Sequence, residues 1–173
     1  MHYDIREILQ YYDSDLRVYD YDQLIEIGVS RNNAEFMVSV GVPEDYDDFV
    51  FYGTDAIQKM LIDGTVFIKI GHYACYGILG SNGLYIKEGE DELFTSSSYR
   101  KPQIYMLNKN LKTFFWFHLI KNELAMEMKR EGGYTTQKYA QELHRLYEQL
   151  DPLAMKDAEG YWSHLIEDYA TGL

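Results

Sequence analysis

Residues 41–53 read GVPEDYDDFVFYG and place a dense run of negative charge beside a predicted strand. Pro43 favours a turn or the first turn of a helix, because its ring fixes φ and it has no N–H to lose. Phe49–Tyr52 is a short aromatic and β-branched run ended by Gly53, which predicts a buried strand. Between them lie four carboxylates, those of Glu44, Asp45, Asp47 and Asp48. The stretch holds no nucleophile, no usual general base and no phosphate-binding loop, so we interpret it as a recognition surface.

The composition is that of one globular domain of 173 residues, with 46% hydrophobic residues and 17 tyrosines. Tyrosine suits both cores and interfaces, because its ring can be buried while its hydroxyl stays in water. No apolar run approaches the ~20 residues that span a bilayer, and the first residues lack the pattern of a signal peptide. The single cysteine, Cys75, excludes an internal disulfide. These features predict a cytoplasmic protein with no membrane partner.

The net charge of −12 is unevenly distributed. Residues 1–55 hold 13 acids and 3 bases, whereas residues 100–130 hold 2 acids and 7 bases. So acidic a chain should repel nucleic acid from most of its surface and attract a basic protein partner. The alternative is that the charge only keeps the protein in solution. That alternative accounts less well for the excess of acids in the first third.

Helical spacing of apolar residues appears at both ends of the chain. It predicts a helix near residues 5–12, a second over Tyr21–Ile27 ended by Gly28, and a third over Arg31–Val40 capped by Ser30. After the predicted sheet, Asn108 is expected to cap a helix over Lys109–Arg130 that is apolar nearly all round, and therefore central and buried. Two further helices are predicted, one capped by Thr136 and ended by Asp151-Pro152, the other running from near Asp157 to Gly172.

The middle of the chain predicts a sheet. Strands are expected at Phe49–Tyr52, Thr65–Gly71, Cys75–Leu79, Leu84–Lys87 and Gln103–Leu107, with a tight hairpin turn at Ser81-Asn82-Gly83. Strands joined by short turns indicate an antiparallel meander. We therefore predict an α+β fold, with residues 1–173 forming a single domain whose mostly antiparallel sheet is packed by N-terminal and C-terminal helices.

No catalytic or metal-binding motif stands out. His72 and Cys75 have ligand-like spacing but lack a second pair, so both are expected to be ordinary sheet residues, with Cys75 a core thiol. Asp45, Asp47 and Asp48 resemble part of a calcium loop, but the required glycine and the closing bidentate acid do not lie at the right offsets. A glycosidase-like carboxylate pair remains an alternative to solvated charge. We expect no cofactor, no metal and no enzymatic activity.

We interpret His118 and the basic residues between Arg100 and Arg130 as structural. His118 lies in the aromatic helix and is expected to be a hydrogen-bonded core residue. The lysines and arginines between Arg100 and Arg130 are spaced along the same helix, so a solvated face is favoured over a nucleic-acid patch.

The order of several short motifs resembles the SUKH superfamily of immunity proteins, and within it the fourth subfamily. The motifs are Gly41-Val42-Pro43, Phe49–Tyr52, Ile70-Gly71, the stretch 78–85, Asn108–Phe114 and the stretch 161–166 around Trp162. The family pattern has a GLP turn, an IG strand end, an N-x-(S/T)-L-x-x-F helix start and a C-terminal tryptophan. Here Val42 replaces the commoner leucine and Asn110 the usual small hydroxyl residue. The resemblance covers residues 24–169.

The resemblance implies a non-enzymatic α+β domain that binds a cognate polymorphic toxin and protects the producing cell. Many such toxins are nucleases, which tend to be basic, so an acidic and tyrosine-rich surface suits the partner. The family has no shared catalytic residues. The partner-binding residues expected here come from the charge pattern alone, and are Glu44, Asp45, Tyr46, Asp47 and Asp48. The alternative is a regulatory or scaffolding domain of the same fold without a toxin partner.

Overall fold

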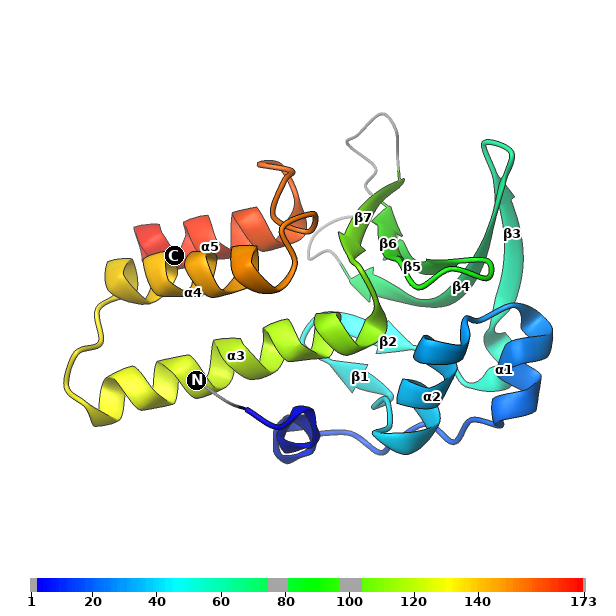
Figure 1. The fold of residues 1–173 in the computed structure, drawn as a ribbon, viewed down its shortest axis with the longest axis horizontal. Helices are drawn as coiled ribbons and strands as arrows, with labels where there is room; N and C mark the ends of the chain where they lie inside the picture. The colour runs from blue at the N-terminus through cyan, green and yellow to red at the C-terminus, as the bar shows by residue number, and fades with distance from the viewer. Residues whose placement is uncertain (1–2, 75–80, 97–103, 173) are drawn as a thin grey trace.

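The computed structural model describes residues 3–74, 81–96 and 104–172, and it confirms the predicted α+β fold with a central antiparallel sheet. The strands are β1 (Asp45–Tyr46), β2 (Phe49–Phe51), β3 (Gln58–Ile62), β4 (Thr65–Ala74), β5 (Ser81–Lys87), β6 (Leu93–Ser96) and β7 (Ile104–Asn108). The helices are α1 (Tyr21–Ile27), α2 (Arg31–Ser39), α3 (Leu111–Arg130), α4 (Thr136–Leu150) and α5 (Tyr161–Thr171), with 3-10 turns η1 (Ile5–Tyr11) and η2 (Thr54–Ala56). Figure 1 shows α3 running beneath the sheet, with α1 and α2 near one of its ends and α4 and α5 alongside it.

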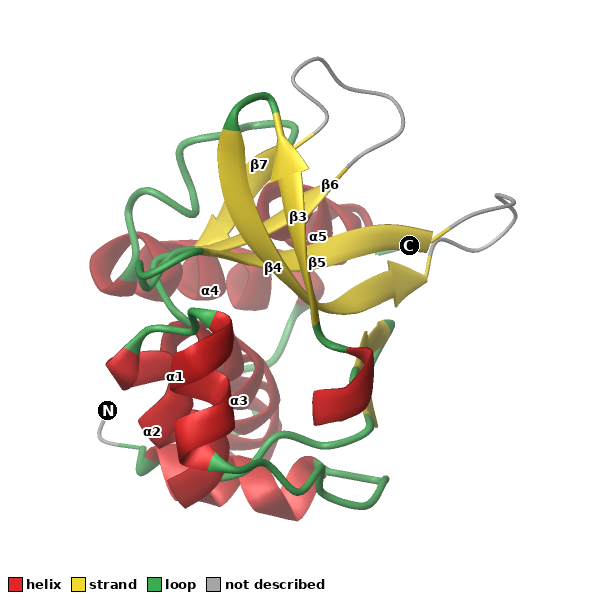
Figure 2. Ribbon diagram, turned by 90° about the vertical axis from the view of Figure 1, so that its right-hand side faces the viewer, coloured by secondary structure: helices red, strands yellow, loops and turns green. Residues whose placement is uncertain are grey.

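The sheet is built around β4, the longest strand. Strands β4 to β7 form a meander in the order β4-β5-β6-β7. The other side of β4 is shared by two short strands: β3 pairs with residues 65–69 and β2 with residues 71–73. The register shifts between Lys69 and Gly71, so the strand is bent where its partner changes. Figure 2 shows the resulting curvature of the sheet.

The long helix α3 is the centre of the core, as its sequence predicts. Its side chains Phe114, Phe115 and Phe117 are fully buried. Phe114 meets Phe49 of β2 at 4.9 Å between ring centroids, in an edge-to-face arrangement. Edge-to-face ring pairs add to the free energy gained by burial alone. The helix therefore anchors β2 through aromatic contacts.

The C-terminal helices close the other side of α3. Phe117 stacks on Tyr147 of α4 with 3.8 Å between centroids. Trp162 of α5 is buried, and its indole N–H donates to the Leu107 carbonyl at 3.1 Å and to Asn108 Oδ1 at 3.0 Å. This tryptophan consequently links the last helix to β7.

Several helix boundaries differ from the predicted ones. Ser30 caps α2 as expected, with its side chain accepting from the Asn33 N–H. For α3 the cap is Asn110 rather than Asn108, because Asn108 is the last residue of β7 and is buried beside Trp162. Thr135 rather than Thr136 caps α4. The last helix begins at Tyr161, since residues before it form a loop.

Two predictions in the sheet were wrong. Strand β3 was not expected, although Asp63 and Gly64 have positive φ and form the two-residue turn between β3 and β4. The turn predicted at residues 81–83 is instead the start of β5, paired with residues 72–74. The Tyr85 ring occupies the space beside Gly83, so this glycine serves a close side-chain approach and not a turn. The strand predicted at residues 75–79 lies outside the described residues.

Among the described residues, none of the helices is long and apolar enough to cross a bilayer.

Substitution of Gly71 tests whether the close approach of β2 to β4 requires a glycine. A Cβ atom at this position would lie 2.3 Å from the Val50 carbonyl oxygen, and both atoms belong to paired strands that cannot move independently. We expect Gly71→Ala to lower the free energy of unfolding by about 1–3 kcal/mol or more, in the range of overpacked cores. Urea denaturation measures this change. The matched control is Gly53→Ala, where no atom lies within 4 Å of the added carbon, and equal losses in both variants would contradict the packing argument.

Candidate functional site

The residues predicted to bind a partner lie on the hairpin formed by β1 and β2. Asp45 and Tyr46 are β1, and Asp47 and Asp48 are the two-residue turn that leads to Phe49. Figure 1 shows this hairpin beside the N-terminal half of α3. The structure gives the five residues 44–48 different roles, and they do not form one uniform surface.

Tyr46 is part of the core and is only 6% exposed. Its ring makes edge contacts with those of Tyr12 and His118, and its hydroxyl accepts a hydrogen bond from Asn122 of α3 at 3.0 Å. Burial and the nearby Asp47 raise the pKa of this tyrosine. Tyr46 therefore holds the hairpin against α3 and does not present its ring to a partner.

Asp47 fastens the turn to α3. It is one of two described non-glycine residues with positive φ, at 50°. One carboxylate oxygen lies 3.0 Å from His118 Nδ1, although the geometry is not that of a regular hydrogen bond, and the same oxygen pairs with Lys121 Nζ. The contacts with His118 and Lys121 thus accompany, and help to offset, the cost of the left-handed backbone at Asp47.

The electrostatics of this cluster follow from its burial. Full burial lowers the pKa of His118 to about 4, a shift that Asp47 opposes and Lys121 reinforces. Burial acts to raise the pKa of Asp47, but its contacts with His118 and Lys121 outweigh burial and hold that pKa well below its usual range. Because His118 is neutral at pH 7, Lys121 supplies the positive charge that keeps Asp47 ionised. The expected core position of His118 is confirmed, but the expected hydrogen bond is not, because neither ring nitrogen has a regular hydrogen-bond partner among the described residues.

Glu44 is also used within the chain. Its carboxylate pairs with Arg17 at 2.8 Å, and Arg17 in turn donates from Nε to the Phe51 carbonyl at 3.0 Å. The Glu44 N–H donates to the Asp15 carbonyl, and the Arg17 N–H donates to the Val42 carbonyl. An extended segment over residues 14–17 therefore lies along the outer side of residues 42–45.

This segment adds carboxylates that the prediction did not name. Ser14 Oγ hydrogen-bonds both the N–H and the carbonyl of Asp45, at 3.0 and 2.9 Å, which brings Asp13 and Asp15 next to β1. Asp13, Asp15 and Asp45 are all exposed, and within the described residues their side chains form no ion pair. We call Asp13, Asp15, Glu44 and Asp45 the acidic ledge.

At the turn, burial and the neighbouring Asp47 raise the pKa of Asp48.

The structure describes one half of the ligand-like pair His72 and Cys75. His72 Nδ1 lies 3.2 Å from the Tyr52 hydroxyl, and burial, aided by Lys69, lowers the pKa of this histidine. No group of three or more histidine, cysteine or acidic residues could hold a metal ion among the residues described. Cys75, the other half of the ligand-like pair, lies outside them.

The basic residues of α3 are engaged in contacts of their own. Lys121 pairs with Asp47, Lys112 Nζ lies 5.2 Å from the centre of the Trp116 ring, and Lys129 Nζ lies 5.1 Å from that of Tyr134. Ahead of the helix, Lys109 donates to the Leu150 carbonyl. Lys109, Lys112 and Lys129 nevertheless remain exposed, as expected for a solvated face.

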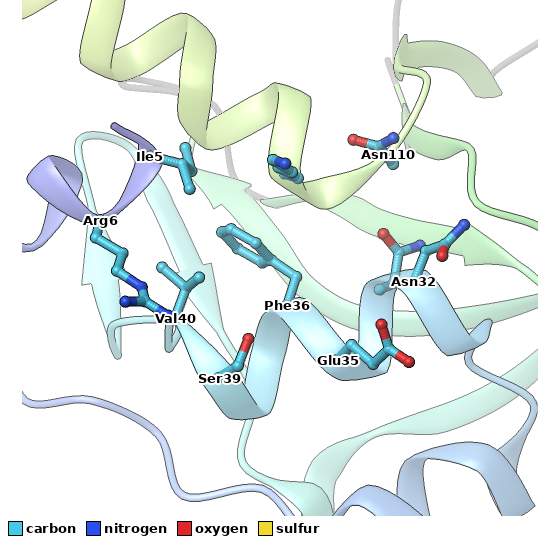
Figure 3. A pocket seen from close by; sticks show the side chains of 10 residues that line it. Ile5, Arg6, Asn32, Glu35, Phe36, Ser39, Val40 and Asn110 are labelled. Atoms are coloured by element: carbon cyan, nitrogen blue, oxygen red, sulfur yellow. The ribbon is translucent and has the colours of Figure 1, made fainter. Parts of the chain in front are cut away.

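A cavity of about 370 Å³ lies between η1, α2 and the start of α3. Figure 3 shows Phe36 and Ile5 facing it, with Arg6, Glu35 and Ser39 around its rim. Asn110, also at its wall, has its amide oxygen committed to the cap of α3. Among the described residues, no hydrogen bond joins a nucleophile of this lining to a base.

His118 gives the fold a defined pH dependence. Its pKa falls from 6.5 to about 4 on folding, so the unfolded chain binds more protons between these values. The stabilisation is complete above pH 6.5 and is lost as the pH falls towards 4, by about 3 kcal/mol at most. Because carboxylates titrate in the same range, the measurement is the difference between the unfolding free energies of wild type and His118→Gln from pH 7 to 4.

We expect the wild type to lose more stability than His118→Gln across this range. The matched control is His144→Gln, which removes an exposed histidine of α4 and should follow the wild-type profile. A profile of His118→Gln parallel to that of the wild type would show that the buried imidazole does not titrate as described.

Comparison with protein-family models, curated proteins and solved structures finds no match to this chain.

Proposed function

We propose that this chain is a non-enzymatic immunity protein, which binds a cognate toxin domain with a basic surface and blocks it. The observation that carries the proposal is the acidic ledge, where two chain segments bring together Glu44, which pairs with Arg17, and three exposed carboxylates without an ion pair among the described residues. Charge of one sign on a rigid, exposed surface steers a partner of opposite charge and raises its association rate.

The motifs that resemble the SUKH superfamily coincide with positions on which the fold depends. Gly41 has φ of 100°, Gly71 allows β2 to approach β4, Asn110 caps α3, and Trp162 joins α5 to β7. A likeness in these positions supports a likeness of fold, since each has a specific structural requirement. The toxin partner is proposed because members of that superfamily bind cognate toxins.

The ion pairs of residues 44–48 indicate which part of this surface would bind a basic partner. Glu44 and Asp47 are balanced by Arg17 and Lys121, so they contribute less to the field than the sequence suggests. Asp45, with Asp13 and Asp15 beside it, carries unbalanced charge. We therefore place the centre of the binding surface on the outer side of β1 and not on the turn.

Co-expression with the product of the neighbouring gene tests the function. If that product is a toxin, we expect the chain to restore growth and to co-purify with it. A chain that neither restores growth nor binds would favour the regulatory or scaffolding alternative.

Charge reversal of the ledge tests the surface. In the triple variant Asp13→Lys, Asp15→Lys and Asp45→Lys, we expect the association rate with the toxin to fall about tenfold or more at low salt, with a weaker salt dependence and little change in dissociation. Stopped-flow binding at several salt concentrations measures both rates. The variant leaves the Glu44–Arg17 pair in place.

The matched control has the same change in net charge at exposed acids of α4 and α5. It combines Glu148→Lys, Glu167→Lys and Asp168→Lys. If the control slows association as much as the ledge variant does, total charge and not the ledge is responsible, and the placement of the surface is wrong.

A further inference from the structure

Strand β3 is a sheet edge that no other described element covers. It pairs with β4 on one side. In Figures 1 and 2 its other side faces outward, with no described helix or strand beyond it. An exposed edge strand presents unpaired N–H and carbonyl groups that can template pairing with another strand.

The register identifies which backbone groups point outward. The Val66 carbonyl accepts from the Glu88 N–H, so Val66 faces β5, and its neighbours Thr65 and Phe67 face β3. Their partners Ile62 and Met60 therefore direct their backbone groups inward. Alternation along the strand leaves the N–H and carbonyl groups of Lys59 and Leu61 directed outward. Neither residue makes a backbone hydrogen bond to a described residue outside the strand pairing.

Backbone groups on the outer sides of β1 and β7 have hydrogen-bond partners, unlike those of β3. The outer side of β1 is covered by residues 14–17, through the hydrogen bonds of Ser14, Asp15 and Arg17. On β7 the Leu107 carbonyl accepts from Trp162. Edge strands are commonly protected by covering segments or by free lysines. The lysine of β3 is not free, because Lys59 Nζ pairs with Glu88.

The side chains and charges of this edge favour association. Leu61 is 73% exposed, next to the outward backbone groups. Residues 58–69 hold two bases, Lys59 and Lys69, against one acid, Asp63, whereas residues 1–55 carry a net charge of −10 from 13 acids and 3 bases. Two copies of so acidic a chain repel each other, and that repulsion is weakest where they approach through a segment without excess acid.

We propose that β3 pairs with the β3 strand of a second copy of this chain, antiparallel and around a two-fold axis at Met60. This register sets Lys59 opposite the partner's Leu61, and each such pair exchanges both of its backbone hydrogen bonds. The methylene groups of Lys59 then cover the partner's Leu61 while the ammonium stays beside Glu88. The inference is independent of the function proposed above.

The dimer is expected to be weak. A five-residue strand buries much less than the ~1,200 Å² at the lower end of stable interfaces. Sedimentation equilibrium over rising protein concentration should therefore show the mean mass increasing from 20.4 kDa towards twice that value. Hydrogen exchange should slow at the amides of Lys59 and Leu61 over the same range, since these amides become paired.

Leu61→Lys tests the register, because it sets lysine opposite lysine in both pairs while replacing an exposed side chain. We expect this variant to remain at 20.4 kDa where the wild type associates. The matched control Leu153→Lys adds the same charge at a leucine that is 60% exposed and lies in the loop between α4 and α5, and it should associate like the wild type.

A wild type that stays monomeric at every concentration overturns the proposal. So does association that Leu61→Lys and Leu153→Lys weaken equally, or that leaves exchange at Lys59 and Leu61 unchanged, since the copies would then meet elsewhere.

Discussion

The aromatic surface of α3 is the constraint on which the rest of the structure depends. Phe114 meets β2 through Phe49 and α5 through Trp162, and Phe117 stacks on Tyr147 of α4. One helix thus sets the positions of a strand from the first third of the chain and of two helices from the last. Because closely packed interiors leave few voids, a shift of α3 would be transmitted to each of these elements.

The same surface includes a polar residue, and this links the core to the acidic hairpin. His118 is fully buried among rings, where only the neutral imidazole is favourable. Asp47 reaches it from the turn between β1 and β2, and Lys121 from the same helix balances the carboxylate. Part of the negative charge that looks available for recognition in the sequence is therefore committed to fastening the hairpin on α3.

The sequence predicted the fold class and the central helix because their signals are local. The apolar run of α3 and the Ser30 cap can be recognised from neighbouring residues alone. Strand β3 was missed because its exposed edge lacks regular alternation, although Asp63-Gly64 was a usable turn signal. Residues 81–83 were misjudged because turn-forming residues also suit a strand where Tyr85 covers Gly83. At the site, Glu44 pairs with Arg17 and Asp47 pairs with Lys121. The partners are far apart in the sequence, so a count of charges along the chain cannot identify these pairs.

The segment over residues 14–17 connects the charge of the chain to the architecture of its sheet. Its backbone covers the outer side of residues 42–45, and the same segment brings Asp13 and Asp15 beside Asp45. On that edge, protection of the strand and the concentration of acid have one structural origin. In the described part of the chain, strand β3 has no corresponding segment, and its one charged residue is Lys59. Covering of the backbone and repulsion by like charge both prevent unwanted strand pairing. Among the described residues neither form of protection is seen along Lys59 and Leu61, and this difference between the two edges is the basis of the strand pairing proposed for β3.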